Sequence, residues 1–224
     1  MDIGKAFTYI FDDEDWLTKV LLGGLFSLLS GILIGIPFIV GYFLETLKNV
    51  YLGQPRPLPN WGDGMGAMFA KGIKAMVGIL IWSLPIIVLS CVFAAISGPL
   101  SAALPSGNSS AGQGAAGLFV AVSLCFNCLI ILYSLALTVM MPAALMKFAV
   151  DENLSAFWAF RDLFSFISRN LSNYIIAIIV YWVASFVAGF GVILCIIGVF
   201  ATTFWSMLVS AHLFGQVYRN ANPI

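Results

Sequence analysis

Few residues in this sequence have side chains that could take part in catalysis or bind a metal, and most of them stand in apolar surroundings. Cys125 and Cys128 have the C-x-x-C spacing of redox and zinc sites, and both thiols would lie on one face of a helix. The sequence has no second C-x-x-C, no nearby histidine and no flanking charge that would lower a thiol pKa. Packing is therefore the favoured interpretation, and the sequence predicts neither a metal site nor a cofactor.

Two ionisable side chains, Glu45 and His212, fall inside or beside apolar segments. Burial of a charge in hydrocarbon is costly, so such residues are functional candidates. For Glu45 the alternative is an ion pair with Lys48 at the end of a helix. His212 is the sole histidine, too few for a metal site, and is favoured as an interhelical hydrogen-bonding residue. Because neither has a second histidine or an aspartate pair to act with, no enzymatic activity is expected.

Four other residues are candidates for partner docking or for a polar role inside the membrane. Trp16 closes an acidic run and precedes an apolar segment, a position where tryptophan favours the lipid headgroup region. Trp61 and Asp63 lie in a Pro/Gly-rich stretch, 54–66, that cannot form a regular helix. This stretch is either an interfacial anchor whose Asp63 caps the next helix, or a docking surface. Asn127 is one of few polar residues in a long uncharged run.

The composition is that of an integral membrane protein. Hydrophobic residues make up 61% of the 224 residues and charged residues only 9%, against roughly 45–50% and about 25% in soluble domains. No charged side chain occurs from Ala75 to Met146 or from Asn170 to Tyr218. Only helices and closed barrels satisfy the backbone in hydrocarbon, and the apolar/polar alternation of barrel strands is absent. The net charge of zero gives no reason to expect nucleic acid as a partner.

The predicted fold class is an all-α membrane protein with about six membrane segments arranged as three helical hairpins. The last 41 residues of apolar sequence, Tyr174 to Phe214, would form a helix of about 60 Å, twice the roughly 30 Å hydrocarbon core, so a break near Gly189 is required. If residues 20–47 form one kinked helix, the chain has five crossings instead. The six segments are 20–35 with 36–52, 75–97 with 118–146, and 174–190 with 192–214.

Basic residues predict the orientation, because an excess of lysine and arginine in short loops marks the cytoplasmic side. With six segments, all ten Lys and Arg residues fall on one side; with five, Lys5 and Lys19 are left outside. Both termini are therefore expected to be cytoplasmic. The acidic start of the chain does not have the basic n-region of a signal peptide.

The chain is expected to form a single membrane domain, 1–224, with four distinct peripheral parts. Residues 1–19 form a cytoplasmic amphipathic N-terminus and residues 53–74 a cytoplasmic loop rich in Pro, Gly and Trp. Residues 98–117 form an external loop. Residues 151–170 are predicted to form one amphipathic helix lying on the membrane surface. Its apolar face comprises Phe157, Phe160, Phe164 and Ile167, opposite Arg161 and Arg169.

Three motifs together resemble an uncharacterised family of prokaryotic integral membrane proteins. They are an acidic run closed by tryptophan (residues 12–16), Leu-Pro-Asn-Trp (58–61) and a C-terminal Ser-Ala-His-Leu-Phe-Gly-Gln-Val-Tyr-Arg (210–219). The resemblance spans essentially the whole chain and implies the cytoplasmic membrane of a bacterium or archaeon. The family has no assigned activity, so it implies no catalytic residue.

Two classes of function remain open. The first is a non-enzymatic scaffold or accessory subunit, which associates with the lipid bilayer and with a membrane-protein partner or a second copy of itself. The second is a small transporter or channel, which needs polar groups near the midplane. Because polar residues are scarce in the apolar segments, its solute would be neutral or lipid-like. Transport predicts that Glu45 or Asn127 faces a wet cavity; a scaffold predicts an exposed apolar groove or patch.

Overall fold

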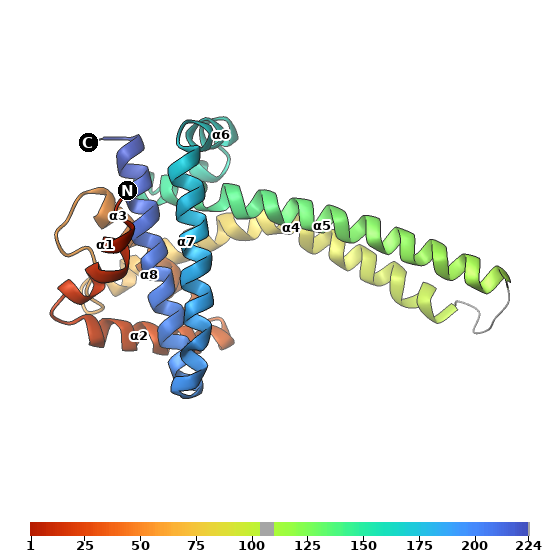
Figure 1. The fold of residues 1–224 in the computed structure, drawn as a ribbon, viewed down its shortest axis with the longest axis horizontal. Helices are drawn as coiled ribbons and strands as arrows, with labels where there is room; N and C mark the ends of the chain where they lie inside the picture. The colour runs from red at the N-terminus through yellow and green to blue at the C-terminus, as the bar shows by residue number, and fades with distance from the viewer. Residues whose placement is uncertain (104–109, 224) are drawn as a thin grey trace. The chain divides into compact units, whose positions relative to one another are not determined.

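The computed structural model describes residues 1–103 and 110–223, and these residues form helices without strands (Figure 1). The predicted all-α class is confirmed. Short 3-10 turns, labelled η, separate several helices. The elements are α1 (Ile3–Thr8), η1 (Tyr9–Asp12), α2 (Trp16–Leu29), η2 (Ser30–Ile32), α3 (Gly35–Tyr51), α4 (Met65–Ala103), α5 (Ser110–Asp151), η3 (Leu154–Phe157), α6 (Phe160–Arg169), α7 (Leu171–Gly189), η4 (Phe190–Leu194) and α8 (Cys195–Ala221).

The chain divides into two compact units. The core unit comprises Met1–Gly78 and Pro142–Ile224. The hairpin unit comprises Ile79–Met141, which is the greater part of α4 and α5. Each unit has its own packing.

Four of the described helices are long and apolar enough to cross a membrane, which makes this a multi-pass membrane protein. They are Met65–Pro99, Ala116–Asp151, Leu171–Ile193 and Gly198–Ala221. A fifth crossing exists if Ile3–Asp12 and Trp16–Ile32, bent by 102° to each other, count as one span. The predicted six is therefore only approximate. At 1.5 Å per residue, the 14 residues of α2 and the 17 of α3 extend only about 21 and about 26 Å, less than the roughly 30 Å core.

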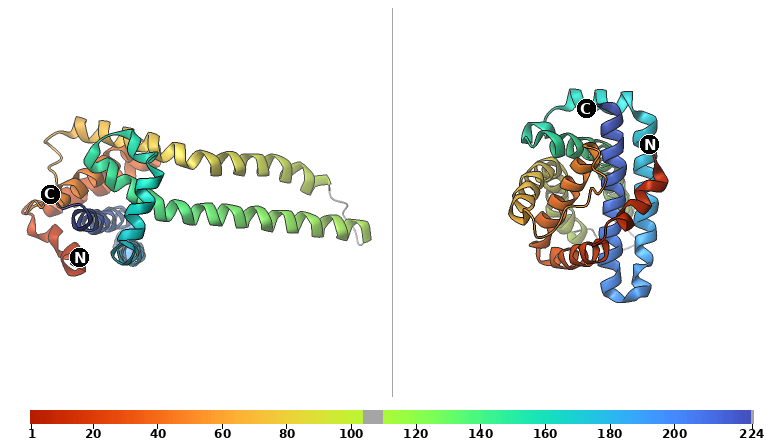
Figure 2. Two further views of the ribbon diagram at one scale, coloured as in Figure 1. Left: turned by 90° about the horizontal axis from the view of Figure 1, so that it is seen from above. Right: turned by 90° about the vertical axis from the view of Figure 1, so that its left-hand side faces the viewer.

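Helix α8 is the centre of the core unit. It lies beside α7 along its length, and η4 joins the two helices where the sequence predicts a break near Gly189 (Figure 2). Helix α2 crosses α8 steeply, and small residues make this crossing close (Figure 1). A side chain at Gly23 would collide with the Phe204 ring, and one at Gly24 would lie 3.0 Å from Ala201 Cα. Helix packing in membranes depends on such close approaches.

Helix α3 makes an equally close crossing with the first turns of α4. A Cβ atom at Gly41 would overlap the carbonyl oxygen of Met68, and one at Gly72 would overlap that of Pro37. The two backbones therefore touch at two points on opposite sides of the crossing. This contact sets the position of the charged side chains that α3 and α4 carry toward each other.

The hairpin unit is held by a few aromatic contacts. Phe93 and Phe126 stack with ring centroids 4.3 Å apart, and the Tyr133 hydroxyl donates to the Trp82 carbonyl oxygen at 2.6 Å. Both ends of the stretch predicted as an external loop, 98–117, are helical, because α4 continues to Ala103 and α5 begins at Ser110. The middle of that stretch, 104–109, lies outside the described residues.

The single amphipathic helix predicted over 151–170 is instead η3 followed by the shorter α6. Asn153 caps η3, with its side chain accepting from the Ser155 N–H. The chain then turns Phe157 inward, where its ring fills the space left by Gly78 and packs 5.4 Å from the Phe148 ring. The predicted face is consequently split, because Phe157 and Ile167 are buried whereas Phe160 and Phe164 are exposed.

Candidate functional site

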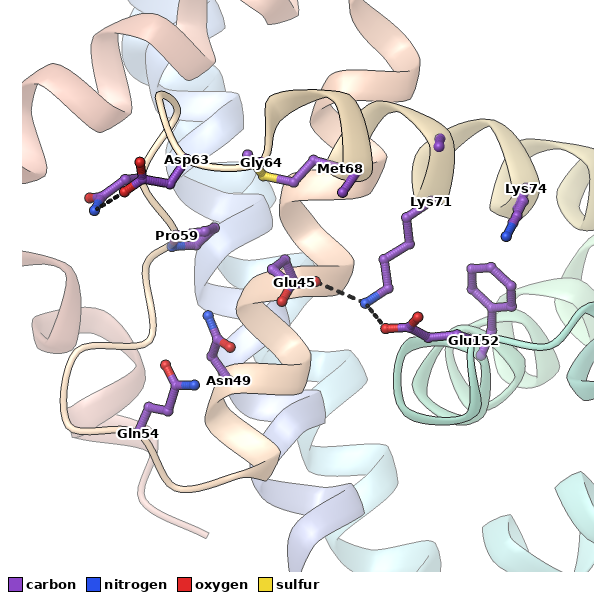
Figure 3. A pocket seen from close by; sticks show the side chains of 14 residues that line it. Glu45, Asn49, Gln54, Pro59, Asp63, Gly64, Met68, Lys71, Lys74 and Glu152 are labelled. Carbon is purple, nitrogen blue, oxygen red and sulfur yellow. Dashed lines mark hydrogen bonds and ion pairs between the residues drawn. The ribbon is translucent and has the colours of Figure 1, made fainter.

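One of the buried lysines of the core unit is Lys71, which lies on α4 and is 9% exposed. Its Nζ atom lies 2.9 Å from Oε2 of Glu45 on α3 and 3.1 Å from Oε1 of Glu152, just after α5. The close crossing at Gly41 and Gly72 carries Lys71 toward α3. An ammonium group this deeply buried requires opposite charges to offset its desolvation. The two carboxylates supply them from opposite sides (Figure 3).

Glu152 also receives a second cation. Lys48 Nζ lies 2.6 Å from the same Oε1 atom that Lys71 contacts. The hydrogen bond from Lys48, followed by that from Lys71, lowers the pKa of the Glu152 carboxyl from its ordinary 4.5 to about 2. Glu152 is thus ionised throughout the physiological pH range. We call Glu45, Lys48, Lys71 and Glu152 the Lys71 cluster.

The backbone at Glu152, which carries this carboxylate, adopts a left-handed conformation. Its φ of +54° lies in the left-handed region, which non-glycine residues occupy at a cost of about 1–3 kcal/mol. The residue ends α5 with its N–H donating to the Phe148 carbonyl oxygen at 2.9 Å. A glycine is the usual occupant of such a helix end. Glutamate is less favourable than glycine in this backbone conformation, but its side chain forms the ion pairs with Lys48 and Lys71.

A cavity of about 610 Å³ opens beside the Lys71 cluster. Charged side chains, amides and small apolar residues share its wall, and they come from α3, the 54–64 loop, α4 and the end of α5 (Figure 3). Of the candidates named by the sequence, Glu45 and Asp63 both line it. The wall residues are Glu45, Asn49, Gln54, Pro59, Asn60, Asp63, Gly64, Ala67, Met68, Ala70, Lys71, Lys74, Phe148 and Glu152.

The loop on one side of this cavity is fixed through three consecutive carbonyl oxygens. Asn49 Nδ2 donates to the Pro57 oxygen at 2.9 Å, Lys19 Nζ to the Leu58 oxygen at 3.2 Å, and the Tyr42 hydroxyl to the Pro59 oxygen at 2.9 Å. Prolines at 55, 57 and 59 exclude regular helix. Side chains of α2 and α3 therefore satisfy a backbone that cannot satisfy itself.

Trp61 is buried beneath this loop. Its indole nitrogen donates to the Lys19 carbonyl oxygen at 3.0 Å, and its ring stacks on Phe26 at 4.7 Å and on Tyr42 at 4.4 Å. With 5% of its surface exposed, Trp61 is a core residue. The loop turns the ring inward, so Trp61 lies in the protein interior and not at the surface, where an interfacial anchor or docking residue would lie.

A second buried ion pair lies nearby. Lys19 Nζ is 2.7 Å from Asp13 Oδ2, and both side chains are less than 9% exposed. Asp13 belongs to the acidic run, so at least one member of that run is structural. Beside it, Trp16 packs edge-on against Phe11 with centroids 4.9 Å apart and opens α2.

His212 belongs to a contact between the two ends of the chain. Its ring stacks on Tyr9 at 4.3 Å, and its Nδ1 atom lies 2.8 Å from Nε2 of Gln216 on the same helix. The Gln216 side chain also accepts from the Asp2 backbone N–H at 2.6 Å and donates to the Asp2 carbonyl oxygen at 2.9 Å. The N-terminal segment is therefore docked on α8, and the C-terminal motif is the surface that receives it.

The hairpin unit holds the remaining candidates. Asn127 is exposed, and its side-chain amide donates to the Ser123 carbonyl oxygen one turn earlier in α5. Cys125 and Cys128 are exposed free thiols. Within the described residues no three His, Cys, Asp or Glu side chains gather as a metal site would require. The structure thus brings Glu45 and Asp63 to one cavity and leaves Asn127 and His212 elsewhere.

A family model described as a protein of unknown function (DUF4013) matches residues 25–197. The chain belongs to this family. The matched range contains the whole Lys71 cluster and the Leu-Pro-Asn-Trp loop, whereas Trp16 and His212 lie outside it. No curated protein and no solved structure matches the chain.

Three residues of these sites were not singled out in the sequence: Lys19, Lys71 and Glu152. Each stands in a stretch that reads as a polar boundary of an apolar segment, where a charge is ordinarily solvated. One signal was available for Lys71, because it lies in a helix start that is rich in Gly and Ala. Such small residues allow another helix to pack closely. Nothing in the linear spacing relates Glu152 to Glu45, which precedes it by more than one hundred residues.

Proposed function

We propose that this protein is a non-enzymatic scaffold or accessory subunit of a prokaryotic cytoplasmic membrane. The observation that carries the proposal is the apolar surface of the hairpin unit. In the most apolar 18-residue stretch of each helix, 6% of the residues are buried in α4 and none in α5. The corresponding shares are 28% in α7 and 56% in α8. Exposed apolar surface of this extent is typical of contact with lipid or with another membrane protein.

The handling of charge in the core unit supports the same proposal. The buried lysines, Lys19 and Lys71, are each paired with carboxylates, and such pairs serve to fix helices relative to one another. In this proposal the ion pairs of the Lys71 cluster hold α3, the start of α4 and the end of α5 together.

The position of the two termini supports the proposed topology. Asp2 is hydrogen-bonded to Gln216 near the end of α8, which supports the proposal that both ends of the chain lie on one side of the membrane. An even number of crossings fits this proposal, with α4, α5, α7 and α8 crossing and the short α2 and α3 entering and leaving on the same face. The distribution of lysine and arginine favours the cytoplasm as that face.

The test is purification of the tagged protein from its native membrane in a gentle detergent, with mass spectrometry of co-purified proteins against an untagged control. The proposal predicts one protein partner, or a second copy of the chain, at a fixed ratio near one. A monomer that brings only bulk lipid would contradict it.

One observation favours the alternative, a small transporter or channel. Glu45 lines a cavity of about 610 Å³, the environment that transport predicts for an ionisable residue in a broken apolar segment. Reconstitution into liposomes separates the two functions. A Glu45→Gln variant would abolish a solute flux carried by this cavity, whereas a scaffold gives no flux above that of empty liposomes.

A further inference from the structure

The cavity beside the Lys71 cluster, here called the Lys71 cavity, offers free groups of both kinds: one unused oxygen on each of two ion-paired carboxylates, and one lysine ammonium. Lys71 uses Glu45 Oε2 and Glu152 Oε1, and among the described residues no interaction occupies the other oxygen of either carboxylate. Lys74, one helical turn after Lys71, lines the same cavity and has no hydrogen bond or ion pair in the described part of the chain. The side chains of Glu45 and Glu152 are 32% and 52% exposed, so a ligand can reach them.

These charges match a ligand that is itself a zwitterion. A primary ammonium group can donate up to three hydrogen bonds, and each of the two free carboxylate oxygens can accept at least one of them. A phosphate group is attracted to a compact lysine ammonium, here Lys74. A ligand with a single charge would satisfy one set and leave the other in a partly desolvated cavity, which costs binding energy.

The place of the cavity in the chain indicates that the zwitterion belongs to a lipid. Lys71 and Lys74 stand near the start of one candidate membrane span, Met65–Pro99, and Glu152 directly follows the end of another, Ala116–Asp151. Span ends lie at the level of lipid headgroups. The cavity wall also includes Ala67, Met68, Ala70 and Phe148, which offer apolar contact to the carbon atoms of a bound lipid.

We propose that this cavity binds the phosphoethanolamine headgroup of a phospholipid, with the ammonium on Glu45 and Glu152 and the phosphate on Lys74. The volume of about 610 Å³ lies within the roughly 300–1,000 Å³ of small-molecule sites. The left-handed backbone of Glu152 holds a side chain that pairs with Lys48 and Lys71 through one oxygen and also lines the cavity. The site does not depend on whether the protein is a scaffold or a transporter.

The experiment is native mass spectrometry of the whole protein, delipidated in detergent and titrated with phosphatidylethanolamine, phosphatidylcholine or phosphatidylglycerol of identical acyl chains. Phosphatidylcholine keeps both charges but has no N–H to donate, and phosphatidylglycerol lacks the cation. We expect phosphatidylethanolamine to bind about tenfold more tightly than either, which corresponds to about 1.4 kcal/mol.

Two variants locate the site. Lys74→Gln is expected to weaken phosphatidylethanolamine binding about fivefold, the effect of one exposed charge pair, and Lys74→Arg to restore it. Because Lys74 is exposed, the thermal unfolding of Lys74→Gln should match that of the wild type. Arg56→Gln is the matched control, since Arg56 is exposed, pairs with Glu14 and does not line this cavity; it should leave binding unchanged.

Four results would overturn the proposal. Equal binding of the three lipids, or binding that Lys74→Gln does not weaken, removes the headgroup from this cavity. Preference for phosphatidylglycerol indicates a purely cationic site. Soluble phosphoethanolamine, added in a separate titration, tests the lipid source: if it binds as tightly as the lipid, the ligand is a free metabolite and the lipid assignment is wrong.

Discussion

Replacement of Lys71 by methionine tests whether the Lys71 cluster holds the core unit together. Methionine retains most of the length of the side chain but removes both ion pairs. The pair with Glu45, in which both side chains are less than a third exposed, is expected to contribute about 1.5–3 kcal/mol as a charged hydrogen bond. The pair with the half-exposed Glu152 adds at most about 1 kcal/mol. Lys71→Met should therefore lower the free energy of unfolding by about 2–3 kcal/mol.

The assay is equilibrium unfolding in mixed detergent micelles with increasing SDS, followed by far-UV circular dichroism. Lys48→Met is the control, because its pair with Glu152 is more exposed and should cost less than about 1 kcal/mol. A double-mutant cycle with Glu45→Gln should give a coupling energy above about 1 kcal/mol. A Lys71→Met variant within about 0.5 kcal/mol of the wild type, the range of ordinary surface changes, would refute the reasoning, as would a coupling energy of zero.

Three further predictions concern acidity, helix packing and the chain ends. Because the pKa of Glu152 is lowered in the folded protein, its stabilisation is complete above pH 4.5 and is lost as the pH falls from there toward 2; SDS unfolding at pH 6 and pH 3 should show this loss, and Glu152→Gln should show a smaller one. Gly72→Ala should destabilise the protein by about 1–3 kcal/mol, because the new methyl group overlaps the Pro37 carbonyl oxygen. Gly66→Ala in the same helix, where the added atom meets open space, should be neutral or slightly stabilising, and equal Tm values for these two variants would contradict the close crossing. Gln216→Ala removes both hydrogen bonds to Asp2 and should speed tryptic cleavage after Lys5 severalfold; an unchanged cleavage rate would show that the N-terminal segment is held by other contacts.

The sequence predicts the class of the fold because burial in a bilayer leaves a strong local signal. Long uncharged apolar runs must be helices when no water is present to satisfy the backbone, and the break near Gly189 follows from length alone. The short α2 and α3 are harder to predict. Their apolar residues are continuous enough to suggest full segments, but the turn at Ser30–Ile32 leaves each helix shorter than the bilayer core.

The candidate site is predicted only in part, because its geometry comes from contacts between distant residues. Glu45 is identifiable from the cost of a charge in an apolar segment, yet its partner Lys71 stands in what the sequence presents as a solvated boundary. Trp61 is identifiable as important but not as buried. Its burial depends on side chains of α2 and α3 that bind the loop carbonyls, and no spacing rule connects those residues to the loop.

The central proposal, that this protein is a scaffold or accessory subunit, is tested most directly by photo-crosslinking from the exposed surface of the hairpin unit in native membranes. A photoreactive side chain replaces Leu124 or Ile131, exposed on the hairpin unit, and Ile179 on α7 is the exposed control position. The account predicts a protein adduct of one defined mass in high yield from the two hairpin positions and lipid adducts from position 179. Lipid adducts alone from all three positions would contradict it.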